Sequence, residues 1–160
     1  MATISRNKLN SSARFGGVPY GNSASLPFKV VTASNGALFD SDTSTGIAAG
    51  DKVRIGVLEA GTQLIDALTI VSTGFTATVT GSLGFEYVDG VDSAAVPQNA
   101  TYFGTGITLA TAGRYRASNN AVAVVTLPKD AYLILTTAVA ANAKAAVVDV
   151  VIDAILKGAP

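Results

Sequence analysis

The sequence predicts an all-β sandwich preceded by an extended N-terminal arm, and three observations carry that prediction. Several short apolar or alternating runs follow one another from Phe28 onward. Turn residues separate these runs at a spacing of about 8 to 15 residues, which is typical of sandwiches. The first 27 residues are rich in Ser, Asn and Gly and show no sustained apolar period. We therefore expect an arm over residues 1–27 and a β-sandwich domain over residues 28–160.

Each strand is predicted from a run that is apolar or alternates. The clearest alternation lies in residues 75–80, where Phe75, Ala77 and Val79 would point inward and three threonines outward. The Asp89-Gly90 pair marks the turn that ends another alternating run. In chain order, the predicted strands are residues 28–31, 53–57, 64–71, 75–80, 83–88, 122–126 and 132–137.

Two further segments leave their secondary structure open. Residues 102–109 read as a strand, but Gly104 and Gly106 weaken that interpretation. The final stretch, Ala143–Leu156, fits either a helix with an aliphatic stripe or a buried strand. Four valines and an isoleucine in residues 147–152 favour the strand, because β-branched side chains suit extended backbone.

The predicted core collects the inward positions of these strands. Because alternation places Phe85 inside, its truncation to Ala should cost about 3–5 kcal/mol. The expected core residues are Val53, Ile55, Leu64, Leu68, Ile70, Phe75, Val79, Phe85, Tyr87, Leu133, Leu135 and Val150.

Composition excludes several functional classes. The chain has no Cys and no His, which removes disulfides, thiolate zinc sites and the Ser-His-Asp and Cys-His forms of catalysis. Eleven basic and eleven acidic residues cancel, so the positive charge expected of a nucleic-acid-binding protein is missing. Charged residues make up 14% of the chain and apolar residues 49%. This balance predicts a large core or surface buried on partners, and we expect a homo-oligomer, with a trimer favoured over a dimer.

No targeting or membrane segment is evident in the sequence. The residues that follow Met1 lack the apolar core of a secretory signal. The longest apolar stretch, residues 145–156, is interrupted by Asp149 and Asp153 and is too short to span a bilayer. We expect synthesis in a cytoplasm and no membrane partner.

The carboxylates are the remaining catalytic candidates. Glu86, Asp89 and Asp92 cluster at a strand end, where a facing pair could serve a glycosidase or hold calcium. The interpretation we favour is structural: Asp89 forms the turn, Asp92 caps the following loop, and Glu86 lies on the solvated side of its strand. Residues 40–42 resemble the start of a calcium loop without its later ligands, and the glycine-rich residues 16–21 lack the lysine of a phosphate-binding loop. The sequence therefore predicts no catalytic residue, no cofactor and no metal.

Charge is distributed unevenly, and this points to the arm as a binding segment. Residues 1–39 carry four bases and no acid, whereas the remainder holds seven bases and eleven acids. Basic side chains with aromatic neighbours are typical of binding hot spots. The predicted partner-binding residues are Arg6, Lys8, Arg14, Phe15 and Tyr20. Farther along, Arg114-Tyr115-Arg116 is either a partner contact or, as we favour, an exposed strand edge.

Two segments of the chain carry a family resemblance. One is AGDKVRIGVLEAGTQLIDALTIV, residues 49–71, and the other is LGFEYVDG, residues 83–90. Together with the last strands they resemble small proteins of tailed bacteriophages that decorate or cement the capsid, over residues 45–157. The resemblance implies a sandwich of jelly-roll type that binds the major capsid protein on the outer surface of the virion, as a dimer or trimer without catalysis. The long polar arm has no counterpart in that pattern.

Two other functional classes remain open from sequence. A receptor- or glycan-binding module of a phage fibre or tail would use the same fold, although five Tyr and no Trp offer few stacking platforms. An enzyme using Glu86 and a neighbouring aspartate ranks third.

Overall fold

The structure is a computed structural model that describes residues 1–6 and 22–158. Within these residues the chain forms ten strands and no helix, so no helix is present that could cross a membrane. The predicted all-β sandwich is thereby confirmed. The strands are β1 (Thr3–Ser5), β2 (Ser23–Thr32), β3 (Lys52–Leu58), β4 (Thr62–Thr73), β5 (Thr80–Tyr87), β6 (Asn99–Thr108), β7 (Gly113–Arg116), β8 (Val125–Thr126), β9 (Ala131–Ala138) and β10 (Ala146–Leu156).

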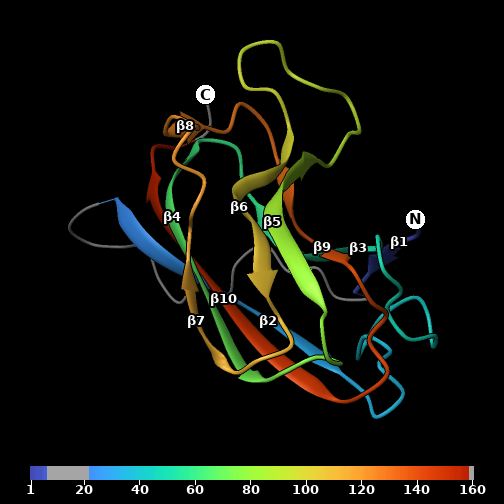
Figure 1. Cartoon of the computed structure of the whole chain (residues 1–160). Coiled ribbons are helices and arrows are strands. Elements are labelled where there is room, and N and C mark those ends of the chain that lie inside the picture. Colours follow the sequence, from blue (N-terminus) through green and yellow to red (C-terminus); the bar gives the residue numbers. More distant parts are fainter. Residues whose placement is uncertain (7–21, 159–160) are drawn as a thin grey trace.

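The strands form two sheets that pack face to face (Figure 1). The first, which we call the β9 sheet, has the order β1-β3-β9-β5-β6. The second, the β10 sheet, has the order β2-β10-β4-β7, and β8 adds to β4. All neighbouring strands run antiparallel except β1, which is parallel to β3. The core lies between the two sheets.

The predicted core is buried except at Leu68 and Ile70, which are half-buried. The reason is a β-bulge in β4: Ala154 pairs with Leu64 while the preceding Asp153 pairs with Asp66. The extra residue reverses the alternation, so that Ala67 rather than Leu68 follows Leu64 into the core.

The two open segments are both strands. Residues 99–108 form β6 despite their glycines, and the final stretch forms β10 from Ala146 to Leu156. Val148, Val150 and Ile152 face inward and are fully buried. β10 pairs with β2 on one side and β4 on the other, which satisfies its backbone and favours strand over helix.

Two predicted strands are wrong in whole or in part. Residues 75–79 form a turn, with Thr78 in the left-handed region at φ 70° and Ala77 exposed, although Phe75 and Val79 are buried. The physical reason is a long-range partner, because the backbone N–H and hydroxyl of Thr76 both donate to the side-chain oxygen of Asn142. Of residues 122–126, the structure places only Val125–Thr126 in a strand.

The predicted arm, residues 1–27, contains strand residues at both of its ends. Thr3–Ser5 pairs with β3, and β2 already begins at Ser23 rather than Phe28. Residues 7–21 lie outside the described part of the chain. An extended arm therefore stays a prediction for those residues.

One end of the sandwich is tied together by Asn142. We call it the Asn142 end; segments 33–51, 74–79 and 139–145 form it. The buried Asn142 side chain donates to Thr32 Oγ1 at 3.1 Å and to the Lys144 carbonyl at 2.9 Å, and it accepts from Thr76 N at 3.1 Å. Packing is so close that a Cβ on Gly36, at φ +80°, would lie 2.0 Å from the Asn142 carbonyl oxygen. A glycine is required there.

Candidate partner-binding surfaces

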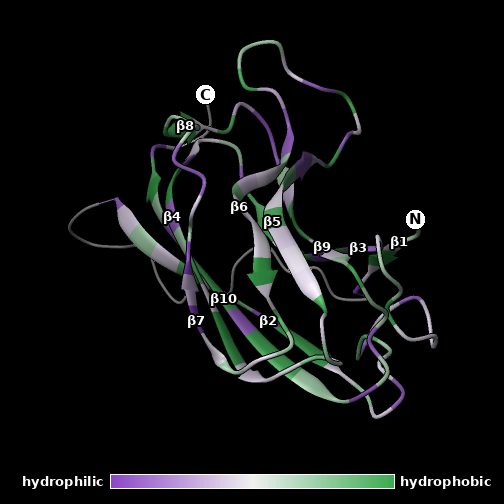
Figure 2. Ribbon diagram, in the orientation of Figure 1, coloured by the Kyte–Doolittle hydropathy of each residue, from purple (hydrophilic) through white to green (hydrophobic). Residues whose placement is uncertain are grey.

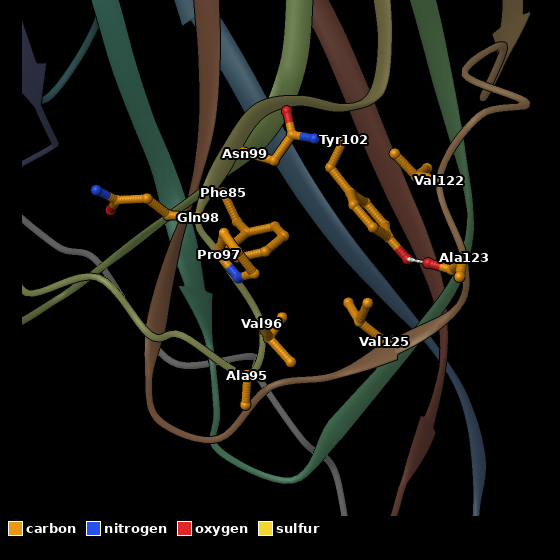
Figure 3. Close-up of a pocket in the computed structure, with 10 residues that line it drawn as sticks. All are labelled: Phe85, Ala95, Val96, Pro97, Gln98, Asn99, Tyr102, Val122, Ala123 and Val125. Carbon is orange, nitrogen blue, oxygen red and sulfur yellow. Dashed lines mark hydrogen bonds between the residues drawn. The ribbon is translucent and has the colours of Figure 1, made fainter.

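The opposite end of the sandwich holds an apolar pocket of about 270 Å³. We call it the pocket end; segments 59–61, 88–98 and 117–130 form it. Figure 3 shows its two walls: Phe85 and the 95–99 segment face Tyr102 and the 122–125 segment across an open gap. The lining residues are Phe85, Ala95, Val96, Pro97, Gln98, Asn99, Tyr102, Val122, Ala123 and Val125.

An irregularity in β6 creates this pocket. Leu83 pairs with Gly104 and Phe85 with Asn99, so a single residue of β5 lies opposite four residues of β6. The excess residues bulge across the end of β5. The bulge fits because residue 84 is glycine, where a Cβ would lie 2.1 Å from the Asn99 carbonyl oxygen. Tyr102 is thereby turned inward beside Phe85.

Tyr102 joins the two walls. Its hydroxyl donates to the Ala123 carbonyl at 2.9 Å, and its ring packs edge-on against Phe85 with centroids 5.5 Å apart. Burial raises the pKa of Tyr102, and a hydrogen bond with the Val125 backbone opposes that shift only in part. The described residues that line the pocket are all uncharged. The site therefore suits an uncharged, apolar group.

Loop 88–98, the long loop at the top of Figure 1, is held against the body by Lys129. The ammonium group of Lys129 donates to Asp89 at 2.7 Å and lies 4.6 Å from the centre of the Tyr87 ring. The Tyr87 hydroxyl in turn donates to the Val96 carbonyl. The hydrogen bond from Lys129, followed by that from the Val91 N–H, holds the pKa of Asp89 below its ordinary value. Val88, Val91 and, across the pocket, Val124 are exposed.

The three clustered carboxylates of the sequence are not brought together as an acid–base pair. Glu86 lies on the outer face of the β9 sheet, where it accepts from Lys52 at 3.0 Å and Arg54 at 2.9 Å. Burial alone would raise the pKa of Glu86, but hydrogen bonds and charges from these two cations outweigh it and lower that pKa. Asp92 accepts two backbone N–H bonds, from Ser93 and Gln98, within its own loop. Asp89 and Asp92 have the turn and loop roles of the favoured interpretation. Glu86 does not lie on a solvated strand position: its side chain is 15% exposed and paired with two cations.

No metal site is evident in the described residues. They contain no group of three Asp, Glu, His or Cys side chains that could hold an ion. In the segment that resembles a calcium loop, Asp42 instead accepts the backbone N–H of Ser5 at 3.1 Å. The glycine-rich residues 16–21 lie outside the described part of the chain.

Arg6 is the one predicted partner-binding residue that the structure describes. Its guanidinium donates to the Lys29 carbonyl at 3.0 Å, and its backbone bridges to Ser41. Arg6 therefore sits at the free edge of β2. The others, Lys8, Arg14, Phe15 and Tyr20, lie outside the described residues.

The Arg114-Tyr115-Arg116 motif is the edge strand β7, which shows hydrophilic colours in Figure 2. Both arginines are exposed, and Arg116 forms an ion pair with Asp66 of the neighbouring β4. Tyr115 is half-buried against the core and donates its hydroxyl to the Thr111 carbonyl at 3.2 Å. The preferred interpretation, an exposed strand edge with a flanking aromatic, matches this arrangement.

Sequence reasoning missed the pocket. It predicted a strand over residues 122–126 and gave no role to residues 95–98, whereas residues of both segments line the pocket. One signal was present: an apolar Ala-Ala-Val-Pro stretch, residues 94–97, inside a long loop. Loops of this length within a compact domain commonly serve a function.

Comparison with known proteins identifies the fold. No family model and no curated protein matches the sequence. A chain of the solved structure "Capsid of Ralstonia phage GP4" superposes with a TM-score of 0.62 at 15% identity, covering 99% of both chains. A chain of "Acidic stable capsid structure of Helicobacter pylori bacteriophage KHP30" has a TM-score of 0.49 at 14% identity, covering 85% of this chain and 94% of that one. The first likeness extends from end to end, so this protein shares the fold of a chain in a phage capsid structure.

Proposed function

We propose that this protein is a non-catalytic structural component of a tailed-phage virion. In this proposal it decorates and stabilises the outside of an icosahedral capsid by binding between subunits of the major capsid protein. The observation that carries the proposal is the superposition over 99% of both chains with a chain of the Ralstonia phage GP4 capsid. The resemblance of residues 49–71 and 83–90 to capsid decoration proteins supports it independently.

The geometry fits a role that needs binding and no chemistry. The candidate carboxylates are occupied: Glu86 by two cations and Asp89 by Lys129. The pocket end instead offers an uncharged pocket beside exposed valines, of which Val91 is 62% and Val124 53% exposed. Apolar side chains around a pocket are the usual centre of protein–protein interfaces.

The arm supplies the second proposed contact. Arg6 is fixed at the edge of β2, and Lys8, Arg14, Phe15 and Tyr20 follow it along the chain. Residues 40–160 contain seven bases and eleven acids, so the acidic body of a neighbouring copy could receive a basic arm. We propose arm-mediated contacts to the major capsid protein or between copies, within a homotrimer rather than a dimer.

The decisive experiment is reconstitution on capsids from the phage that encodes the protein, prepared without it. Purified protein added to these shells should co-sediment at a saturating ratio and appear at fixed outer positions by electron cryo-microscopy. Sedimentation of the free protein should show a trimer at micromolar concentration. Protein that stays in the supernatant at all concentrations would overturn the proposal, and binding on a glycan array would instead support the receptor-binding class.

Matched variants test which surface binds. Val91→Asp and Val124→Asp at the pocket end should weaken shell binding at least tenfold, while Val139→Asp at the Asn142 end, where Val139 is 71% exposed, serves as control. The arm is tested by replacing Lys8, Arg14, Phe15 and Tyr20 with Ala. Substitution is preferable to deletion of residues 2–21, because Thr3–Ser5 belongs to the β9 sheet. If these substitutions leave the affinity for the shells and its salt dependence unchanged, the arm takes no part in binding.

A further inference from the structure

Asp51 is a buried carboxylate at the start of β3. It is 6% exposed, and its two oxygens accept backbone N–H groups, Oδ1 from Ala2 at 2.8 Å and Oδ2 from Ala48 at 2.9 Å. Its own carbonyl accepts the N–H of Thr137 at 3.0 Å, which fixes the residue in place. Among the described residues, no lysine or arginine forms an ion pair with it. A buried charge without a countercharge is costly.

The nitrogen that faces this carboxylate belongs to the second residue of the chain. Met1 is 89% exposed, whereas from Ala2 onward the backbone joins the β9 sheet, with the Lys52 N–H donating to the Ala2 carbonyl at 2.9 Å. Ala2 is also a small residue. Methionine aminopeptidases remove an initiator methionine when the next residue is small, and an exposed Met1 does not obstruct them.

We propose that, in a chain translated from Met1, removal of this methionine creates an α-ammonium group at Ala2 that forms a buried ion pair with Asp51. In this step a methionine aminopeptidase adds water across the Met1–Ala2 peptide bond. Methionine leaves with the new carboxylate, and the Ala2 nitrogen becomes a primary amine that takes up a proton. That nitrogen already lies 2.8 Å from Asp51 Oδ1, so the pair forms without rearrangement.

The exchange replaces a neutral donor by a charged one at the same carboxylate oxygen. A hydrogen bond with one ionised partner is already stronger than a neutral one, and the ammonium group adds a charge on the second partner. The processed end supplies the countercharge that Asp51 lacks in the described residues, and it fastens β1 to the edge of its sheet. In a chain translated from Met1, Asp51 thus receives the processed N-terminus.

The first test is the intact mass and amine reactivity of protein expressed from Met1. The mass should show the loss of one methionine residue. At neutral pH an amine-reactive reagent prefers α-amines over lysines, because their ordinary pKa is lower. Native protein should react at Ala2 at least tenfold more slowly than the Asp51→Asn variant. Retained Met1, or equal labelling rates in the two proteins, would overturn the proposal.

The second test measures stability in matched N-termini. Ala2→Ser keeps a small second residue and permits processing, whereas Ala2→Gln blocks it; the Ala2 side chain is exposed and tolerates both. Asp51→Asn should lower the folding equilibrium constant roughly tenfold more in the Ser background than in the Gln background. If Asp51→Asn does not fold, the Ser protein should still unfold at higher denaturant than the Gln protein. Equal stability in either comparison contradicts an ion pair.

Discussion

The two ends of the sandwich are held by different kinds of interaction. At the Asn142 end a buried, neutral amide bonds to Thr32, Thr76 and Lys144, and the Asn142 backbone leaves no room for a side chain at Gly36. At the pocket end the ammonium group of Lys129 holds loop 88–98 through Asp89, and an open pocket lies beside this loop. The same two sheets thus carry one closed end and one open end.

This difference indicates where the molecule can adapt. Buried amide networks are rigid, because every polar group that loses its partner pays a full desolvation cost. Exposed ion pairs contribute little to stability and respond to salt and pH. We therefore expect the pocket end to adjust to a partner while the Asn142 end keeps the sheets in register.

The largest effect should follow from Asn142→Ala. Loss of the amide leaves the Thr76 N–H without its acceptor, at about 1–3 kcal/mol, and removes the hydrogen bonds that the amide donates to Thr32 Oγ1 and the Lys144 carbonyl, at about 1 kcal/mol each. We expect a loss of about 4 kcal/mol in chemical denaturation. Asn119→Ala at the pocket end, where the half-buried amide donates to the Thr101 carbonyl at 3.1 Å, is the control and should cost under about 1 kcal/mol. Equal losses of stability in the two variants would show that the two ends of the sandwich do not differ in how firmly they are held.

A loss of similar size should follow from Phe85→Ala. Phe85 is 1% exposed and packs against Tyr87 and Tyr102, so its truncation should cost about 3–5 kcal/mol in thermal or denaturant unfolding. Phe39→Ala, at a side chain that is 66% exposed, should change stability by about 0.5 kcal/mol or less. A small effect at Phe85 would mean that the pocket wall is not packed as the structure has it.

An intermediate effect, with a pH signature, is expected of Glu86→Gln. Because the folded pKa of Glu86 lies below its ordinary value, its ion pairs with Lys52 and Arg54 add stability above about pH 4.3. That contribution is lost as pH falls through the folded pKa. Side chains of the two cations are 30% and 31% exposed, so solvent screening limits the loss to about 1 kcal/mol at pH 7. Denaturation curves from pH 7 to pH 2 should converge for the two proteins; a constant gap would contradict the assignment.

The smallest global effect is expected of Lys129→Met. The Asp89–Lys129 pair is exposed, so unfolding should change little, whereas amide hydrogen exchange in loop 88–98 should accelerate. The lowered pKa of Asp89 implies that acid releases the same loop in the wild type as pH falls through that pKa. Lys144→Met, an exposed lysine at the other end, should leave loop 88–98 unchanged. Equal exchange in wild type and Lys129→Met would show that other contacts hold the loop.

Sequence patterns predicted the strands and their inward-facing residues correctly where neighbours along the chain decide the structure. The valine-rich stretch in β10 is extended, as β-branched residues favour, and the alternation in β5 places Leu83, Phe85 and Tyr87 inside. Asp89 and Asp92 likewise act in the turn and the loop that their local context suggested.

The sequence could not show features that depend on distant partners. Residues 75–80 alternate as a strand would, yet Thr76 bonds to Asn142, 66 residues away. A bulge decides which residues of β4 point into the core, and this bulge appears only in the pairing of β4 with Asp153 and Ala154. The pocket depends on two loops that approach each other across the sandwich, and no local pattern records that approach.

The position of β10 also bears on how the protein is made. β10 is the last strand in chain order, yet it lies between β2 and β4 and is the sheet partner of β2 over ten residue pairs. A nascent chain on the ribosome therefore holds β2 without its hydrogen-bonding neighbour until β10 has emerged. Pairing across such a separation is slow, because the loop-closure entropy must be overcome first. Chains interrupted before Ala146 lack β10 and leave β2 and β4 without the strand that joins them.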